Sequence, residues 1–194
     1  MINSKLDHVK TVKEFYESIR HQQETAHGED YCQIHDAIKK YMKDCKSYME
    51  LGTHQGGTAS TALLTNPEKI YLVDIDMSRY RKYLSPLAEE YCNKHNIELI
   101  VKEADSTSFM TINTTDMLVI DSYHNPTHMQ KELNVHGANV RKYIIAHDTS
   151  IINGRPNESL YLCLKNFASK NGWEVIERGT TNVGYTVIKN AGVG

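Results

Sequence analysis

From about residue 46 onward, short runs of β-branched and other apolar residues alternate with longer stretches of helical periodicity. This alternation predicts a mostly parallel sheet covered by helices, because parallel strands need crossover connections that are usually helical. We therefore expect an α/β fold. The expected strands are 47–51, 70–74, 99–102, 117–121 and 143–147, and the expected helices between them are 58–64, 79–95, 126–138 and 156–170.

The two ends of the chain differ from this central pattern. Segments 173–177 and 185–189 alternate apolar and polar residues around a glycine-containing loop, which predicts an antiparallel hairpin that closes the sheet. Residues 1–45 are rich in Lys, Glu, Gln and His, with apolar residues at helical spacing, and predict two amphipathic helices joined near Gly28. These helices form a packing layer, which the sequence modestly favours, or else a lid or a dimer contact. We expect a single domain, 1–194, with its α/β core at 46–190.

Charge and composition exclude several classes of protein. Lys and Arg number 22 against 24 Asp and Glu, a formal charge of −2, so the basic excess of a nucleic-acid-binding protein is missing. The chain lacks a run of roughly 18 apolar residues, and Met1 to Asp7 lack the apolar core of a secretion signal. We expect a soluble, cytoplasmic protein. Its cysteines are too far apart for a C-x-x-C site and are expected to stay reduced: Cys32, Cys45, Cys92 and Cys163.

Acidic residues stand at or just beyond the ends of the expected parallel strands. In open α/β sheets, ligands bind beyond the carboxyl ends of the strands. We therefore expect these side chains to gather along one edge of the sheet, where they would form a binding site. They are Glu50, Asp74, Asp105, Asp121 and Asp148.

The segment ELGTHQGGT, from Glu50 to Thr58, follows the first strand and opens a helix. Gly52 and Gly56 let the backbone turn sharply and approach a ligand, and the helix start presents unpaired amides. The spacing G-x-x-x-G departs from the G-x-G-x-x-G of dinucleotide folds. The leading glutamate would repel a phosphate but could accept hydrogen bonds from an ammonium group, directly or through water. The expected cofactor contacts in this turn are Glu50, Gly52, Thr53, His54, Gly56 and Thr58.

The ends of the second and third strands carry polar residues that could bind a ribose and an adenine. Asp74 lies about twenty residues past the glycines, the position of a carboxylate that binds ribose hydroxyls. Asp105 and Ser106 end the third strand, where a carboxylate and a hydroxyl could accept from or donate to an adenine edge. Ammonium, ribose and adenine together describe S-adenosylmethionine. His54 either contacts its methionine part or only shields it.

The stretch from Tyr48 to Lys189 resembles the class I S-adenosylmethionine-dependent methyltransferases. Within that group it most resembles the macrolide-sugar, rhamnosyl and cephalosporin-hydroxylase-like O-methyltransferases, and more distantly catechol O-methyltransferase. The resemblance implies a Rossmann-like, seven-stranded sheet with one reversed strand near the end. It rests on ELG at 50–52, VIDSYH at 119–124, AHDT at 146–149, WEVIER at 173–178 and GYTV at 184–187.

Methyl transfer to a hydroxyl needs a base and benefits from a cation that lowers the hydroxyl's pKa. In the resembling sugar enzymes a D-x-x-H pattern supplies a metal ligand and the base, which implies that Asp121 is a ligand, beside the cofactor, and that His124 is the base. A later acidic pair supplies further ligands, and this chain has His147 and Asp148 there. Carboxylates suit Mg²⁺, whereas His147 favours a softer ion such as Mn²⁺, Fe²⁺ or Zn²⁺.

The expected function is a metal-assisted O-methyltransferase that acts on a small hydroxylated acceptor, such as a sugar or a sugar-bearing metabolite. The N-terminal helices or a second copy of the chain would complete its pocket. One alternative is a protein that binds S-adenosylmethionine without catalysis, or an accessory subunit. Another is an NAD-dependent oxidoreductase, which the glycine spacing and Glu50 disfavour. We expect His128 at the surface or behind the ligands, and no special role for His8, His21, His27 and His35.

Overall fold

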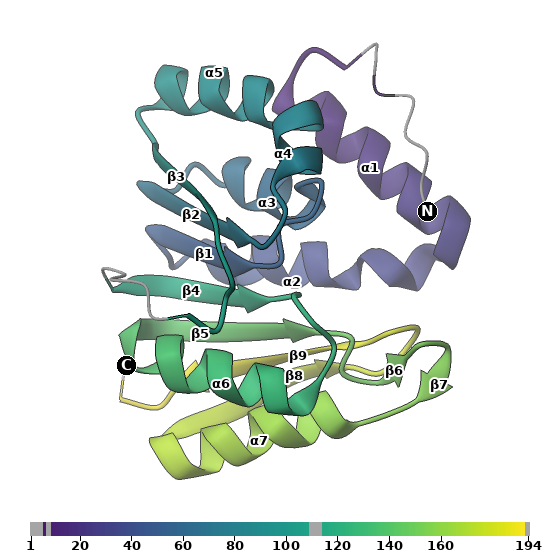
Figure 1. Ribbon diagram of the computed structural model, residues 1–194, viewed down its shortest axis with the longest axis vertical. Coiled ribbons are helices and arrows are strands. Elements are labelled where there is room, and N and C mark those ends of the chain that lie inside the picture. The colour runs from purple at the N-terminus through teal and green to yellow at the C-terminus, as the bar shows by residue number, and fades with distance from the viewer. Residues whose placement is uncertain (1–5, 7–8, 109–113, 193–194) are drawn as a thin grey trace.

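A seven-stranded sheet forms the centre of the protein (Figure 1). The computed structural model describes residue 6 and residues 9–108 and 114–192, so all of Met1 to Asp7 except Leu6, the segment without the apolar core of a secretion signal, lies outside the described residues. The strands of the sheet are β1 (Ser47–Leu51), β2 (Lys69–Asp74), β3 (Glu98–Glu103), β4 (Thr115–Ile120), β5 (Val140–His147), β8 (Trp173–Gly179) and β9 (Tyr185–Asn190).

The strand order is β3-β2-β1-β4-β5-β9-β8. Neighbours from β3 to β5 pair in parallel, whereas β9 runs antiparallel to both β5 and β8. This confirms the expected α/β fold, the C-terminal hairpin and the single reversed strand. Because β1 to β5 run the same way, their carboxyl ends share one edge of the sheet.

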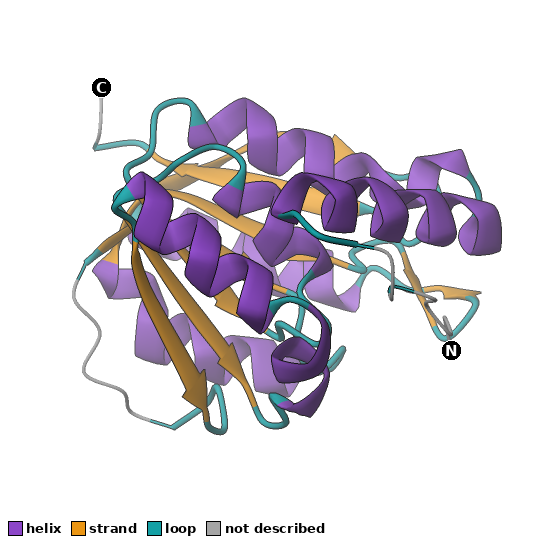
Figure 2. Cartoon of the chain, turned by 90° about the horizontal axis from the view of Figure 1, so that it is seen from above, coloured by secondary structure: helices purple, strands orange, loops and turns teal. Residues whose placement is uncertain are grey.

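Helices cover both faces of the sheet (Figures 1 and 2). One face packs against α6 and α7 and the other against the remaining α-helices, through two separate apolar clusters. Two short 3₁₀ segments and a two-stranded ribbon complete the fold. The helices are α1 (Val12–His27), α2 (Gln33–Met42), α3 (Gly57–Leu63), α4 (Ser78–Tyr83), α5 (Ser85–His95), α6 (Pro126–His136) and α7 (Ser159–Asn171), the 3₁₀ segments are η1 (Glu29–Cys32) and η2 (Gly137–Asn139), and the ribbon joins β6 (Ile151–Ile152) and β7 (Arg155–Pro156).

Two expected helices have different boundaries in the structure, and a proline explains each difference. The helix expected at 79–95 is divided into α4 and α5, with Pro86 in the first turn of α5. A proline inside a helix removes a hydrogen bond and clashes with the preceding turn, so the second helix has to begin there. The helix expected from Pro156 begins at Ser159, because Pro156 belongs to β7. Pro126 does open α6, and the preceding Asn125 caps this helix because its side chain accepts a hydrogen bond from the Thr127 amide.

The N-terminal helices form a packing layer on the sheet. Phe15, Ile19, Ile34 and Ile38 are at most 2% exposed and join the apolar cluster that contains Tyr48 of β1. All four cysteines are free thiols. Among the described residues, no helix has the length and apolar character needed to cross a membrane.

His35 of α2 is part of this packing layer, contrary to its expected place in an ordinary polar stretch. Its ring is 2% exposed, and Nδ1 lies 2.6 Å from the Thr61 hydroxyl of α3. Burial, together with the nearby charge of His147, lowers the pKa of His35 from an ordinary value of 6.5 to about 3. The folded protein therefore holds this imidazole neutral, whereas the unfolded chain takes up a proton below pH 6.5.

We predict that His35 lowers the free energy of unfolding as the pH falls below 6.5, so that His35→Asn loses less stability than the wild type between pH 7 and pH 5. The unfolded state then binds one more proton than the folded state, which lowers the free energy of unfolding by up to about 1.4 kcal/mol per pH unit. Urea unfolding at pH 7 and pH 5 would measure it. The exposed His21→Asn serves as the control. Equal pH dependence in the wild type and His35→Asn would contradict the prediction.

Candidate active site

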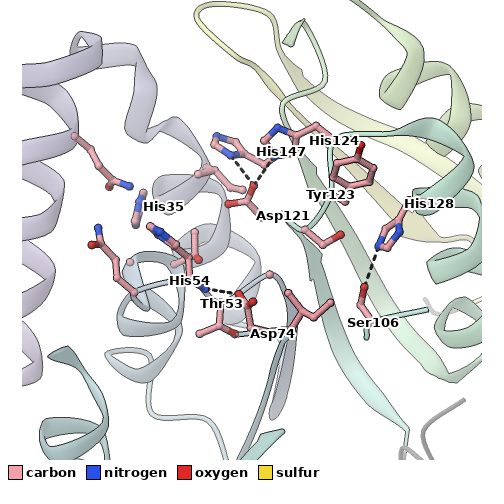
Figure 3. A pocket seen from close by; sticks show the side chains of 18 of the residues that line it. His35, Thr53, His54, Asp74, Ser106, Asp121, Tyr123, His124, His128 and His147 are labelled. Carbon is pink, nitrogen blue, oxygen red and sulfur yellow. Dashed lines mark hydrogen bonds and ion pairs between the residues drawn. The ribbon is translucent and has the colours of Figure 1, made fainter. Parts of the chain in front are cut away.

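The carboxyl edge of the sheet borders a cavity of about 580 Å³ (Figure 3). Its walls come from the turn after β1, the ends of β2, β4 and β5, the residues after β3, the start of α6, and the N-terminal segment α1–η1–α2. A cavity of this volume is typical of a small-molecule site. Of the ten residues expected to contact a cofactor, eight line it: Gly52, Thr53, His54, Thr58, Asp74, Asp105, Ser106 and Asp121.

The two glycines of the turn have different structural roles. Gly52 has φ +91°, and a Cβ atom there would lie 2.2 Å from the carbonyl oxygen of Asp121. Only glycine therefore allows the turn to lie against the end of β4. Gly56 has φ +93°, and its Cβ would lie 2.4 Å from a methyl carbon of Leu84, so this glycine faces α4 and α5 behind the cavity.

Glu50 is fully buried behind the cavity wall. Its Oε1 accepts a hydrogen bond of 3.0 Å from the Thr58 hydroxyl, and the Tyr48 hydroxyl donates to its Oε2. Burial raises the pKa of Glu50 to about 8. Thr58 lines the cavity, so the Thr58 side chain lies between Glu50 and the cavity.

Asp74 is held in one orientation by backbone amides. Its Oδ2 accepts from the His54 amide at 2.7 Å, and its Oδ1 accepts from the Asp76 amide at 3.0 Å. Each carboxylate oxygen has further lone pairs that can accept from a ligand. The His54 backbone has φ +48°, and its ring nitrogen Nε2 lies 2.9 Å from Nη1 of Arg79. The backbone of His54 thus fixes Asp74, whereas its side chain lies on the cavity wall beside Arg79.

Two carboxylates and two imidazoles meet at the ends of β4 and β5. Figure 3 shows three of these side chains, Asp121, His124 and His147. The Nδ1 atom of His147 lies 3.2 Å from Oδ1 of Asp121 and 3.2 Å from Oδ2 of Asp148. The Nε2 atom of His124 lies 3.1 Å from the same Asp148 oxygen and 3.6 Å from the Asp121 oxygen. Asp148 has φ +55°, an uncommon backbone conformation for aspartate.

The charges in this group compensate one another. Burial alone would lower the pKa of His147, but Asp121 and Asp148 raise it to about 10. Burial likewise opposes ionisation of Asp121, but the two histidines hold its pKa well below the ordinary value. A hydrogen bond to Asp121 raises the pKa of His124. Protonated imidazole thus balances two adjacent carboxylates.

The same donor set suits a divalent cation. Asp121, His124 and Asp148 each present one ligand atom, and these atoms lie within 4.8 Å of one another. Carboxylate oxygens and an imidazole nitrogen fit Mg²⁺, Mn²⁺, Fe²⁺ or Zn²⁺. The expected ligand set contained His147 in place of His124. The structure brings both rings to the carboxylates, with the His147 side chain 7% exposed and that of His124 39% exposed.

The N-terminal helices contribute cavity residues that the sequence did not reveal: Gln23, Tyr31, Ile34 and His35. The Tyr31 ring meets the His147 ring edge-on, with centroids 5.8 Å apart. Burial, together with the charges of Asp121 and Asp148, raises the pKa of Tyr31, so its hydroxyl keeps its proton. Helical spacing could have placed His35 on the buried face of α2, because it lies three residues before the buried Ile38. No local pattern marked Gln23 or Tyr31.

The charge of the cavity wall discriminates between ligand classes. Asp74, Asp105 and Asp121 line it, and no Lys or Arg is among the described lining residues. The positive charge of His147 is already paired with Asp121 and Asp148, so a dinucleotide pyrophosphate would find no unpaired cation among the described lining residues and would be repelled by the carboxylates. A ligand with a positive charge is the better match.

Comparisons with known proteins bear on this arrangement. No family model and no curated protein matches the chain. Among solved structures, a candidate caffeoyl-CoA O-methyltransferase from Staphylococcus aureus is 11% identical, with 81% of this chain and 83% of that chain covered and a TM-score of 0.61. Ribosomal protein L11 methylase from Lactobacillus delbrueckii subsp. bulgaricus is 12% identical, with 84% and 79% covered and a TM-score of 0.60.

A third match is magnesium protoporphyrin IX methyltransferase from Synechocystis PCC 6803, solved with bound S-adenosylmethionine. It is 10% identical, with 94% of this chain and 85% of that chain covered and a TM-score of 0.59. The three names refer to different acceptors, so the fold leaves the acceptor open. The narrower resemblance to macrolide-sugar and rhamnosyl enzymes rests on the sequence motifs. The comparisons establish that the protein has the Rossmann-like fold of the class I methyltransferases.

Proposed function

We propose that this protein is an S-adenosylmethionine-dependent O-methyltransferase that uses a divalent ion and methylates a hydroxyl of a small acceptor, such as a sugar or a sugar-bearing metabolite. One observation carries the proposal. A single acidic cavity joins the glycine turn and Asp74 to Asp121 and His124, with Asp148 directly behind them. This combination provides a place for a cationic donor next to groups that can activate a hydroxyl.

The proposed position of the donor follows from the strand ends. Asp74 would bind the ribose hydroxyls with the lone pairs that its amide partners leave free. Ile75 is 76% exposed, lines the cavity next to Asp74, and offers an apolar surface to the adenine. Asp105 and Ser106 would meet the adenine edge. The methionine part would then lie toward the glycine turn and the N-terminal helices. Bound S-adenosylmethionine supplies an electrophilic methyl group on a positively charged sulfur.

For the metal, we propose Asp121 and Asp148 as ligands, with His147 as the third. A divalent ion bound there would lower the pKa of an acceptor hydroxyl. His124 is the more exposed of the two imidazoles and faces the cavity, so we assign it as the base. The acceptor hydroxyl gives its proton to Nδ1 of His124, because Nε2 faces the carboxylates of Asp148 and Asp121. The acceptor oxygen takes the methyl group from sulfur. The products are a methyl ether and neutral S-adenosylhomocysteine.

Aromatic residues near His124 suit a ring-shaped acceptor. Tyr123 is 68% exposed and lines the cavity beside His124, and Tyr31 of η1 lines it next to the His147 ring. Flat aromatic faces bind the apolar face of a ring while polar groups at its edge fix its orientation. This supports a sugar or a similar ring as the acceptor.

We predict that Asp74→Asn weakens S-adenosylhomocysteine binding about 10- to 100-fold, because a charged acceptor of the ribose hydroxyls is lost. Isothermal titration calorimetry would measure the affinity. Asp44→Asn, exposed at the far end of β1, should bind as the wild type does. Binding of NAD in place of S-adenosylhomocysteine by the wild type would contradict the proposal.

Metal removal gives a second prediction. The assay measures the S-adenosylhomocysteine released when the protein is given S-adenosylmethionine and a panel of free and nucleotide-linked sugars as acceptors. Excess chelator should abolish this release, and added Mg²⁺ or Mn²⁺ should restore it. Asp148→Asn should weaken ion binding by about 10-fold or more, because one charged ligand is lost. Full turnover in chelator would refute the metal assignment. Tight cofactor binding with no turnover on any acceptor would favour a non-catalytic binding protein.

A third prediction separates a base from a ligand at His124. As the base, His124→Gln should lower turnover at least about 100-fold. Its affinities for S-adenosylhomocysteine and for the divalent ion should stay within about threefold of the wild type. His95→Gln, on the exposed side of α5, is the control. A loss of ion affinity of tenfold or more would instead make His124 a metal ligand, and unchanged turnover would remove it from the mechanism.

A further inference from the structure

One face of α6 holds Ser106 in place. His128, Glu132 and His136 are four residues apart and so lie on the same side of the helix. The Ser106 hydroxyl donates to Oε1 of Glu132 at 2.5 Å and lies 3.1 Å from Nε2 of His128. The Nε2 atom of His136 lies 2.7 Å from the carbonyl oxygen of Ser106 and donates to it. Three side chains from one helix therefore fix the residue that follows Asp105.

Glu132 also reaches the end of β4. The Ser122 hydroxyl donates to the same Oε1 at 2.5 Å, and Nε2 of His128 lies 3.3 Å from it. The Glu132 carboxyl group is fully buried, and its Oε2 has no hydrogen-bond partner among the described residues. A buried carboxyl group is costly, so its position between two serines calls for an explanation.

The direction of these hydrogen bonds determines what the cavity offers a ligand. A serine hydroxyl has one proton and two lone pairs. The protons of Ser106 and Ser122 point to Glu132, and both residues line the cavity. Toward the cavity, these two oxygens can only accept hydrogen bonds. Without Glu132, each hydroxyl could rotate and donate to a ligand carbonyl instead.

We propose that Glu132 is a positioning residue that makes Ser106 and Ser122 hydrogen-bond acceptors toward the cavity, so that this end of the site selects a purine edge that donates. The inference rests on the proposed S-adenosylmethionine site and refines it. The 6-amino group of adenine donates and matches these acceptors. The 6-oxo group of hypoxanthine would face them unpaired, and buried unpaired polar groups reject a ligand strongly.

The test compares two ligands that differ only in the base, S-adenosylhomocysteine and S-inosylhomocysteine, by calorimetry. The wild type should prefer the adenosyl ligand at least about 30-fold. Ser106→Ala and Glu132→Leu should each lower this preference at least about fivefold, since the first removes an acceptor and the second frees both hydroxyls. Glu132→Gln keeps a carbonyl oxygen for the serines and should stay within about twofold of the wild type. Glu90→Gln, exposed on α5, is the control.

The outcomes separate this inference from the proposed function. A wild type that binds neither ligand would overturn the methyl-donor site itself. A wild type that binds both ligands equally would overturn the inference alone, as would an undiminished preference in Ser106→Ala and Glu132→Leu. If Glu132→Leu does not fold, an undiminished preference in the Ser106→Ala and Ser122→Ala double variant would overturn the inference, because that variant removes both acceptors.

Discussion

The carboxylates of Asp121 and Asp148 lie next to each other at the ends of β4 and β5, and their mutual repulsion must be compensated. The parallel pairing of Ile120 with Ala146 brings these strand ends together. His147 lies 3.2 Å from each carboxylate and supplies positive charge where no Lys or Arg lines the described cavity wall. A site built in this way accepts cations, whether protons, a divalent ion or a sulfonium, and disfavours phosphates. The proposed chemistry depends on this balance of charge.

Elements outside the strand ends complete the site. The N-terminal helices pack on the sheet through Phe15 and Ile19, and the same segment places Tyr31 and His35 on the cavity wall. The N-terminal segment therefore both packs on the sheet and forms part of the cavity wall. On the opposite side, α6 contributes His128 to the cavity wall, and Glu132 lies behind Ser106 and Ser122. The cavity is therefore shaped by helices from both layers, which is how so short a chain provides material around a small ligand.

Much of the fold could be predicted because the strands have a strong local pattern. β1 has the expected bounds, and the observed β2 to β5 differ from expectation by at most three residues at an end. The wrong helix boundaries arise at proline and turn residues, which the helical spacing of apolar residues does not reveal. Pro86 had to interrupt the helix expected at 79–95. Asn153 and Gly154, both with positive φ, form the turn of the β6–β7 ribbon before Pro156, a pair that strongly favours such hairpins.

The site was less predictable, because its contacts join residues far apart in sequence. The positions of Asp74, Asp121 and Asp148 at strand ends predicted that they lie close together, since a parallel sheet brings the carboxyl ends of its strands to one edge. Glu50 was expected to meet a ligand, yet it lies behind Thr58, because burial depends on packing that no local pattern encodes. Glu132 has no such pattern either, since its partners come from the ends of other strands.

A crystal structure of the protein with S-adenosylhomocysteine and Mn²⁺ would test the central claim most directly. Our account predicts ribose hydroxyls on Asp74, the sulfur between the glycine turn and His124, and the ion on Asp121 and Asp148. A ligand bound elsewhere, or an ion that avoids both carboxylates, would contradict it.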